Sequence, residues 1–427
     1  MNFRDSEFAQ GLLLESGFDR AESAEDADII LFNTCSVRKH AEDRVYANIW
    51  NLKKLKNKRP GLVIGVIGCM AQAKREAVFE DIPLVDFTCG PDNETELPKV
   101  IGDILKDRAA IASLDRIGLT RQELSPRYRD NKIKTFVSIS HGCGNYCSYC
   151  IVPYVRGRER SRAPEDILRE IKDLAERGFK EITLLGQNVN SYDGYGRGRG
   201  GFVKLLEEID RIKGDFWLRF MTSHPKDASA ELFKAMRDLG KVCEHLHLPL
   251  QSGSDRILKI MNRGYSGRDY LKSAESYKKF LPKGSLTTDI IVGFPSESDS
   301  DFKKTVDLMK KIEFDSAFIF KYSPRPYTKA SCLEDDVLPE TKSRRNSFLL
   351  EMQSHISRKL NDSLVGTTQR VLIEGKAPKQ RGAGSLVGRT RTNKTVLVEG
   401  RDESLIGNFA DAKIKGATCS TLRGAAI

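Results

Sequence analysis

Three cysteines, Cys143, Cys147 and Cys150, stand close together on a segment that directly follows a short apolar run. The segment contains glycine, which lets a backbone bend tightly around a bound group. Three thiolates at this spacing can each hold one iron of a four-iron, four-sulfur cluster. Because no fourth cysteine is near in the sequence, one iron would stay open for another ligand.

An open iron of this kind can chelate the amino and carboxylate groups of S-adenosylmethionine and pass an electron to its sulfonium. Cleavage of the S–C bond then releases a deoxyadenosyl radical, chemistry that the cofactor supplies and the protein positions. The alternatives are a zinc knuckle or three unrelated buried cysteines. Zinc normally takes four Cys or His ligands in two pairs, and no second CxxC follows His141. The sequence therefore predicts that Cys143, Cys147 and Cys150 hold an S-adenosylmethionine-binding 4Fe-4S cluster.

A second pair of thiols, Cys35 and Cys69, follows two apolar runs at residues 29–32 and 62–67. Ligands gather at the carboxyl ends of neighbouring strands in an open parallel sheet. A nearby helix N-terminus also favours thiolate. The pair thus suggests a second metal site, although cysteine is also a common small core residue. Cys89, Cys243, Cys332 and Cys419 lack such company and are interpreted as packing residues, with Cys89 noted because it follows another short strand.

Composition limits the class of protein. The 427 residues, 39% of them apolar, allow two or three domains. No apolar run is long enough to cross a bilayer, and the N-terminus has no secretory h-region. We therefore expect a cytoplasmic protein without a membrane partner, in which thiols stay reduced. The net charge of +11 fits either a nucleic-acid partner or a solvated lysine surface.

The elements that must position these cysteines fall into three regions, and the fold class is α/β. Residues 1–115 predict an open parallel α/β sheet that opens on a helix at 7–16, without a strand before it. Residues 130–360 predict a partial (β/α)6 barrel, entered through a basic linker at about 120–134. Its strands are expected at 135–140, 181–185, 217–221, 245–248, 286–292 and 317–321, with helices such as 164–177 and 299–312. Residues 363–427 predict a small β-barrel from runs at 369–373, 395–398 and 410–415, and they hold eleven Lys/Arg against five Asp/Glu.

Over nearly its whole length the sequence resembles the radical-SAM methylthiotransferases. The matching motifs are NTCSVR (33–38), GC (68–69), VPYVRG (152–157), SR (161–162), LLGQNVNSY (184–192), SHP (223–225), LPLQSGS (248–254) and DIIVGFP (289–295). The tail from Ser363 resembles the TRAM RNA-binding domain that ends these enzymes. The forms around Cys35, Val152 and Gln187 are most similar to the branch that acts on tRNA.

The resemblance implies a methylthiotransferase that modifies C2 of N6-isopentenyladenosine beside the tRNA anticodon. It implies two 4Fe-4S clusters and two molecules of S-adenosylmethionine, one to methylate a sulfur of the auxiliary cluster and one to yield the radical that removes hydrogen from C2. It further implies the anticodon stem-loop as partner, an electron donor such as flavodoxin or ferredoxin, and a monomer. Related branches modify threonylcarbamoyl-adenosine in tRNA or an aspartate of a ribosomal protein, and these targets are alternatives.

The resemblance also places four segments at the barrel mouth, near cofactor and substrate: those of Gln187, Ser223, Gln251 and Asp289. Each of these residues has a plainer interpretation as a strand-end cap or a turn residue. No catalytic side chain beyond the cluster ligands is indicated.

One feature departs from the family. Its auxiliary cluster has three cysteine ligands, and the first precedes a Met-Asn pair, which is Met1-Asn2 here. Either the true start lies upstream, or the protein has only Cys35 and Cys69. We expect the chain as written to cleave S-adenosylmethionine but to insert sulfur weakly, and a truncated RNA-binding form is a further alternative.

Overall fold

The computed structural model describes residues 1–36, 39–107, 111–114, 128–196, 200–378, 384–400 and 402–427. These residues form two compact units. Unit 1 comprises Met1–Asp130, Ser140–Arg160 and Ser323–Ser331; unit 2 comprises Asn131–Ile139, Ser161–Tyr322 and Cys332–Ile427. Val37 and Arg38 of the first motif, and most of the predicted linker, lie outside the described residues.

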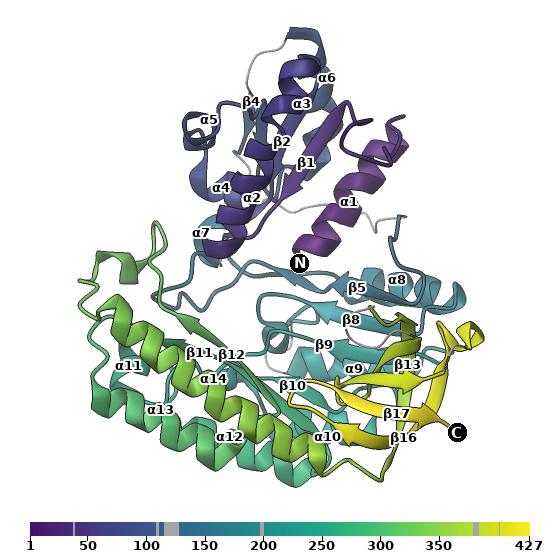
Figure 1. The fold of residues 1–427 in the computed structure, drawn as a ribbon, viewed down its shortest axis with the longest axis vertical. Coiled ribbons are helices and arrows are strands. Elements are labelled where there is room, and N and C mark those ends of the chain that lie inside the picture. Colours follow the sequence, from purple (N-terminus) through teal and green to yellow (C-terminus); the bar gives the residue numbers. More distant parts are fainter. Residues whose placement is uncertain (37–38, 108–110, 115–127, 197–199, 379–383, 401) are drawn as a thin grey trace. The chain divides into compact units, whose positions relative to one another are not determined.

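Unit 1 is built on the predicted open sheet, whose four strands are all parallel in the order β1-β2-β3-β4 (Figure 1). The strands are β1 (Ile29–Asn33), β2 (Val63–Ile67), β3 (Phe87–Cys89) and β4 (Ile111–Ser113). The helices are α1 (Asn2–Glu15), α2 (Lys39–Asn51), α3 (Lys53–Lys58), α4 (Cys69–Lys74), α5 (Ala77–Asp81), η1 (Glu94–Glu96), α6 (Leu97–Asp107) and α7 (Val152–Val155). The short elements β6 (Ser140–His141), β7 (Arg160–Ser161) and η5 (Lys329–Cys332) complete the unit, the last two each ending one residue beyond it.

Helix α1 begins at Asn2, earlier than the predicted start at residue 7, so that boundary was wrong. The first turn is polar, so apolar periodicity gave no signal for it. Tertiary contacts hold this turn instead, because the Asn33 side-chain amide donates to the Asn2 carbonyl at 2.9 Å and to Ser6 Oγ at 3.0 Å. The helix stops where predicted, since Gly17 adopts φ +88°, a conformation that favours glycine.

Unit 2 begins with six parallel strands, which confirms the predicted partial barrel. They are β5 (Lys134–Ser138), β8 (Glu181–Leu185), β9 (Trp217–Phe220), β10 (His245–His247), β11 (Ser285–Val292) and β12 (Ser316–Lys321). A parallel bridge between Leu218 and Val242 joins the β5-β8-β9 sheet to the β10-β11-β12 sheet. The connecting helices are α8 (Pro164–Glu176), η2 (Val189–Ser191), α9 (Gly201–Asp210), η4 (Pro225–Asp227), α10 (Ala230–Asp238), α11 (Asp255–Ile260), α12 (Gly267–Phe280), α13 (Asp299–Ile312) and α14 (Pro339–Asp362).

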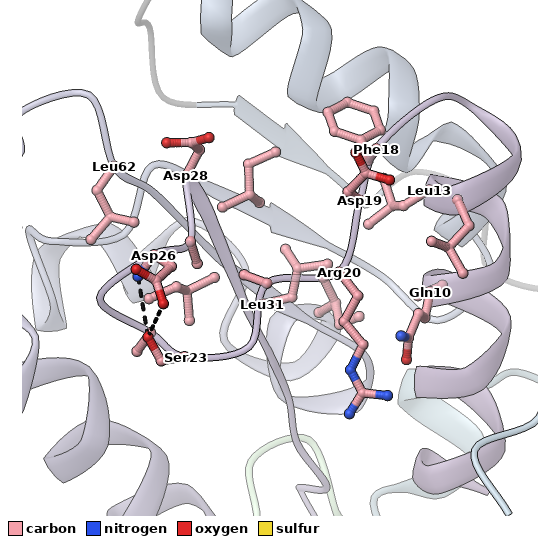
Figure 2. A pocket seen from close by; sticks show the side chains of 18 of the residues that line it. Gln10, Leu13, Phe18, Asp19, Arg20, Ser23, Asp26, Asp28, Leu31 and Leu62 are labelled. Atoms are coloured by element: carbon pink, nitrogen blue, oxygen red, sulfur yellow. Dashed lines mark hydrogen bonds between the residues drawn. The ribbon is translucent and has the colours of Figure 1, made fainter.

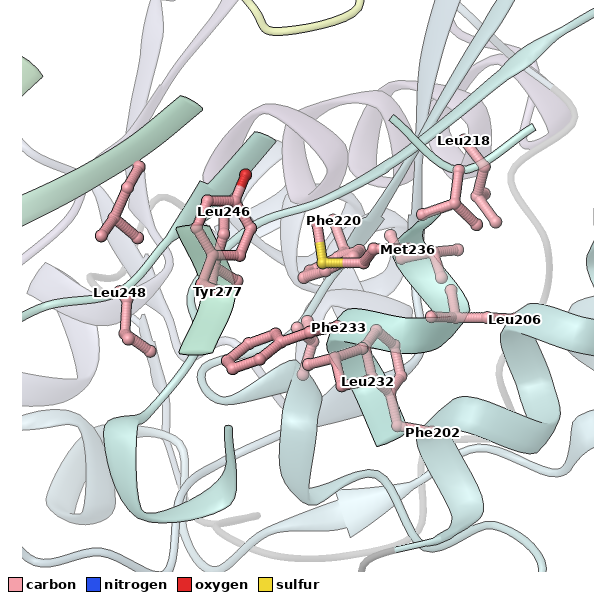
Figure 3. Close-up of a cluster of buried hydrophobic side chains, with 14 of the residues drawn as sticks. Phe202, Leu206, Leu218, Phe220, Leu232, Phe233, Met236, Leu246, Leu248 and Tyr277 are labelled. Atoms are coloured by element: carbon pink, nitrogen blue, oxygen red, sulfur yellow. The ribbon is translucent and has the colours of Figure 1, made fainter. Parts of the chain in front are cut away.

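One apolar core lies between these strands and helices. Figure 3 shows part of it, where Phe202 of α9 and Phe220 of β9 meet edge to face with ring centroids 5.1 Å apart. Phe233 of α10 and Tyr277 of α12 form a second such pair at 5.6 Å. Because the strands are fixed from outside by these contacts, the loops at their carboxyl ends start from rigid positions.

The C-terminal part of unit 2 is the predicted small barrel. It closes in the order β13-β14-β15-β17-β16. Its elements are β13 (Thr368–Lys376), β14 (Ser385–Thr390), β15 (Thr395–Glu399), η6 (Glu403–Leu405), β16 (Phe409–Ala417) and β17 (Leu422–Ala426). Strands β14 and β17 were not predicted, because both contain glycine and lack a continuous apolar run.

The small barrel is attached to the larger one by a hairpin turn and an aromatic contact. The Arg219 guanidinium donates to the carbonyls of Thr390 and Arg391, each at 2.7 Å. Ser285 Oγ donates to the Thr392 carbonyl, and Trp217 packs on Phe409 with ring centroids 4.6 Å apart. Within the described residues no helix is long and apolar enough to cross a membrane.

Candidate functional site

Cys35 and Cys69 lie at the carboxyl ends of two paired strands of unit 1. Strands β1 and β2 run parallel, with Asn33 opposite Ile67. Beyond them the Thr34 carbonyl accepts from the Met70 amide at 3.3 Å, so the two strand ends stay adjacent. Gly68 adopts φ +86°, and a side chain there would meet Asn33 Oδ1 at 2.5 Å. This position therefore requires glycine, and it sets the direction in which Cys69 enters α4.

A buried arginine and a buried carboxylate accompany Cys69. The Nε–H of Arg156 donates to Cys69 Sγ at 3.0 Å, and its Nη2 donates to Asp5 Oδ2 at 2.6 Å. Arg156 is 3% exposed and Asp5 fully buried, so this ion pair is shielded from water. Arg156 follows α7. Val155 of this helix and Ile151 just before it pack on Cys69 and Ala73 of α4.

Burial and a neighbouring cation act on the Cys69 thiol in opposite directions. Burial raises the pKa of the Cys69 thiol, and the Arg156 guanidinium opposes that rise. Burial also lowers the pKa of Arg156, but Asp5 and Cys69 outweigh it and raise that pKa well above its usual value. Arg156 is therefore a permanent cation beside Cys69. The sequence analysis included Arg156 in a motif but gave it no role, and Asp5 gave no signal at all.

The loop of Cys143, Cys147 and Cys150 belongs to the same unit. Gly142 adopts φ +75°, and a Cβ there would come within 2.2 Å of the Arg158 carbonyl oxygen. The Cys143 amide donates to the Gly157 carbonyl at 3.2 Å, and the Cys150 amide donates to the Cys147 carbonyl at 3.0 Å. The Ala330 amide donates to the Ser148 carbonyl at 2.8 Å. These backbone contacts fix the loop at its start, its middle and its end.

The donor set on this loop fits an iron–sulfur cluster. Cys143 and Cys147 are buried and Cys150 is half-buried, and all three are outside any disulfide. Among the described residues, no three His, Cys, Asp or Glu side chains converge on a single point where one metal ion would bind. A four-iron cluster makes a different demand, because each thiolate binds a different iron and the sulfurs stand apart.

In unit 2, the predicted residues Gln187 and Ser223 lie just beyond the carboxyl ends of β8 and β9. Gln187 is half-buried and Ser223 is buried. The Oε1 atom of Gln187 and the Oγ atom of Ser223 have no hydrogen-bond partner among the described residues. The Val189 amide donates to the Thr222 carbonyl at 3.0 Å, which ties the two loops together.

Gln251, four residues beyond the end of β10, lies beside Asp289 of β11. Gln251 adopts φ +70°, and its amide donates to the Asp289 carbonyl at 2.8 Å. The Asp289 carboxylate lies 3.3 Å from His247 Nε2. His247 Nδ1 in turn contacts Thr287 Oγ1 at 3.0 Å, so a row of polar side chains follows β10 and β11. The structure thus brings the four predicted residues together as two pairs, of which three residues follow strand ends and Asp289 lies within β11.

His224 is a site residue that the sequence analysis named only as part of a motif. It is buried at the end of β9, where its Nδ1 accepts from the Lys226 amide at 3.3 Å. Burial, with the cations Arg263 and Lys226 nearby, lowers its pKa to about 2. The imidazole is therefore neutral at physiological pH. A lone histidine after an apolar strand offers no sequence signal for this state.

The other cysteines have separate environments. Cys89 is buried at the end of β3, and Cys243 packs against Trp217 and Leu372, which is consistent with packing roles. Cys332 and Cys419 are exposed, so their interpretation as packing residues was wrong. Exposure follows from their positions, at the end of the short helix η5 and between β16 and β17.

A separate pocket of about 1250 Å³ lies beside α1 and β1 (Figure 2). Its lining includes Gln10, Leu13 and Phe18, and Ser23 and Asp26 pair with each other at its rim. None of the described residues that line it is Cys or His. The pocket therefore offers no soft metal ligand and is distinct from the thiol groups.

Comparison with family models agrees with this division of the chain. The model of the Uncharacterized protein family UPF0004 matches residues 1–90. The model of the Radical SAM superfamily matches residues 137–309, and that of the TRAM domain matches residues 362–427.

Curated relatives match the chain from end to end. A protein of Thermoanaerobacter sp. (strain X514) is 46% identical over 99% of this chain and 90% of its own length. A protein of Carboxydothermus hydrogenoformans is 44% identical over 100% of this chain and 97% of its own length. Both are named tRNA-2-methylthio-N(6)-dimethylallyladenosine synthase.

Among solved structures, a similar fold occurs in the radical S-adenosylmethionine methyltransferase TsrM from Kitasatospora setae. The TM-score is 0.53 at 15% identity, over 77% of this chain and 68% of that one. At that identity the likeness concerns the fold alone.

Proposed function

This chain belongs to the radical-SAM methylthiotransferase family, in the branch of the tRNA-2-methylthio-N6-dimethylallyladenosine synthases, and we propose that it adds a methylthio group to C2 of N6-isopentenyladenosine beside the tRNA anticodon. The observation that carries the proposal is the three-thiol loop, Cys143 to Cys150, in a chain that matches these synthases at 44–46% identity over its whole length. An unactivated aromatic C–H bond resists acid–base chemistry, so a radical route suits this substrate.

Cys143, Cys147 and Cys150 would hold the 4Fe-4S cluster that binds S-adenosylmethionine. That group, when bound, supplies the deoxyadenosyl radical. The protein's part is to keep the three thiols on a fixed loop, which the glycine conformation at residue 142 and the contacts to Gly157 and Ala330 achieve. Gln187, Ser223, Gln251 and Asp289 would contact cofactor or substrate from the ends of the barrel strands.

We further infer that Cys35 and Cys69 are ligands of a second 4Fe-4S cluster. Their position at adjacent strand ends, and the Arg156 cation beside Cys69, support this inference. A buried cation stabilises the negative charge of a thiolate-bound cluster. The chain would work in the cytoplasm as a monomer, with a one-electron donor such as flavodoxin or ferredoxin. We propose the domain division 1–115, 130–360 and 363–427.

The small C-terminal barrel would contact the RNA. Many of its basic side chains are engaged in ion pairs, for example Arg391 with Glu244 and Lys394 with Asp315. Lys413 and Arg423 are exposed on β16 and β17 and form no ion pair with any described residue. These two side chains are therefore available to bind phosphates.

The proposed RNA contact makes a direct test possible. The double variant K413A/R423A should bind an anticodon stem-loop more weakly. The slope of the logarithm of its binding constant against the logarithm of the salt concentration should also be smaller by about two. K415A is the matched control, because Lys415 pairs with Glu399 on the same barrel. Equal affinity of both variants would exclude this face as the RNA contact.

Activity is tested on anaerobically reconstituted protein and tRNA that carries N6-isopentenyladenosine. We expect iron–sulfur absorption, deoxyadenosine formation and the 2-methylthio product. The C143A/C147A/C150A variant should lose deoxyadenosine formation and product together. Zinc at the loop, or product formation by the triple variant, would exclude the proposal, and methylthiolation of threonylcarbamoyl-adenosine or of a protein aspartate instead would reassign the target.

A further inference from the structure

Two loops of unit 2 carry an unusual concentration of unmatched polar atoms. They follow β8 and β9, and Asn188, Asn190, Ser223 and His224 on them are each at most 5% exposed. Among the described residues no hydrogen-bond partner exists for Asn188 Oδ1, either amide atom of Asn190, Ser223 Oγ or His224 Nε2. A buried polar atom without a partner destabilises the folded protein, and native proteins contain few of them. Their concentration indicates that a bound ligand satisfies them.

Contacts to other atoms of these loops and to neighbouring residues hold the two loops, so the unmatched atoms have fixed positions. The Val189 amide donates to the Thr222 carbonyl, and Asn188 Nδ2 donates to Asp227 Oδ2 at 2.8 Å. The His224 ring meets the Tyr265 ring edge to face at 5.7 Å. The Tyr265 hydroxyl donates to the Leu250 carbonyl at 2.8 Å.

The hydrogen-bonding role of His224 follows from its contacts. Its Nδ1 accepts from the Lys226 amide, so the proton of the neutral ring is on Nε2. His224 therefore presents one N–H donor. The Asn190 carboxamide presents one donor and one acceptor side by side.

The chemistry of this set selects the ligand. All four side chains are uncharged, so they suit a neutral group with both donors and acceptors rather than a phosphate or a carboxylate. A carboxamide pairs in a bidentate manner with the N6–H and N7 atoms of adenine. An N6-alkylated adenine keeps one N6–H, and its C2 lies on the opposite side of the base.

We propose that Asn190 and His224 form a base-reading site in which the Asn190 carboxamide pairs with N6–H and N7 of the target adenine and the His224 Nε2–H donates to an acceptor of the same nucleotide. This inference rests on the proposed function, because it takes the modified adenosine as ligand. It assigns Asn190 and His224 the role of positioning residues that leave C2 free for the reaction.

The test measures binding of an anticodon stem-loop to reconstituted enzyme with S-adenosylhomocysteine, so that no turnover occurs. One RNA carries N6-isopentenyladenosine at the target position, a second carries its 7-deaza analogue there, and a third carries a 7-deaza-adenosine elsewhere in the loop. The wild-type enzyme should bind the second about tenfold more weakly than the first, and should bind the third normally. Failure to bind the first RNA would contradict the proposed function, whereas equal binding of the first two would overturn only this inference.

Variants then assign the residues. N190D keeps the side-chain shape but replaces the donor that faces N7 with an acceptor, so it should prefer the 7-deaza RNA to the normal RNA. H224F should weaken binding about tenfold, and H224Q, which restores an N–H donor, should recover most of it. Retained preference for N7 in N190D, or equal affinity of H224F and H224Q, would overturn the inference. Loss of S-adenosylhomocysteine binding with unchanged discrimination between RNAs would overturn it as well, by assigning these atoms to the cofactor.

Discussion

At the scale of single residues, a buried ion pair between Arg156 and Asp5 lies beside the Cys69 thiol. It joins an arginine to a carboxylate 151 residues away in the chain, with Cys69 as a third member. Sequence spacing located the cysteines because thiol clusters are local patterns. It gave no role to Arg156 or Asp5, because their partnership exists only after α1, α4 and α7 have packed together.

Replacement of Arg156 should therefore destabilise the protein. The R156M variant removes the buried guanidinium that pairs with Asp5, so we expect the free energy of unfolding to fall by about 3–5 kcal/mol. R156K keeps the positive charge but not the planar fork of donors, so its free energy of unfolding should fall less than that of R156M. Urea unfolding of the reduced, metal-free protein measures this, with R158M as control, since Arg158 is exposed two residues further on. Equal midpoints for R156M and R158M would show that the ion pair does not stabilise the fold.

His224 should make stability depend on pH. Its folded-state pKa of about 2 lies below its ordinary value of 6.5, so between these values the unfolded chain binds more protons. Stability is therefore complete above pH 6.5 and falls as the pH is lowered, by up to about 1.4 kcal/mol per pH unit for this group. Between pH 7 and pH 5 the wild-type protein should lose about 2 kcal/mol more than H224Q. Chemical denaturation at the two pH values checks this, and equal losses would mean that the histidine is protonated in the folded protein.

At the scale of elements, buried apolar runs predicted the barrel strands well. Strand β8 and helix α13 have the predicted bounds. All five residues of β8 are buried, and α13 begins with a Ser298–Asp301 capping box. Strands β14 and β17 escaped prediction because Gly388 and Gly424 interrupt them. Both glycines pack against neighbouring backbone in the closed barrel, where a Cβ would come within 2.5 Å of a carbonyl oxygen. The need for glycine at these two positions follows from the pairing of strands in the closed barrel, which the sequence of one strand does not reveal.

The same reasoning applies to the cysteine loop and gives a matched pair of variants. G142A should force the loop away from the Arg158 carbonyl and strain a positive φ, at a cost of roughly 1–3 kcal/mol. G144A should be tolerated, since a Cβ there meets no atom within 4 Å. Iron content and deoxyadenosine formation after anaerobic reconstitution should both fall for G142A and stay at the wild-type level for G144A. Equal iron in the two variants would show that the loop adapts without its glycine turn.

At the scale of the whole molecule, the pattern of apolar runs predicted a barrel followed by a smaller barrel. It did not predict that the two share one compact unit. One of the contacts that join them is made by Arg219, which binds the Glu181 carboxylate at 2.6 Å and also two carbonyls of the small barrel. Each partner is unremarkable alone in the sequence. Together they fix the C-terminal barrel on the strands that carry the proposed base-reading loops, so an RNA held by one part is held at a defined position relative to the other.

We therefore expect the two barrels to unfold together, and Arg219 to couple them. The R219M variant leaves Glu181 buried without its arginine and takes one donor from each of two carbonyls, which should cost about 3–5 kcal/mol. Hydrogen exchange should then rise in β13 to β17 as well as in β8 and β9, because both sides of the contact lose their partner. R237Q is the control, since Arg237 is exposed and its ion pair is with its neighbour Asp238. If exchange in the small barrel stays at the wild-type level while β8 and β9 open, the C-terminal barrel is an independent folding unit and its attachment contributes nothing to its stability.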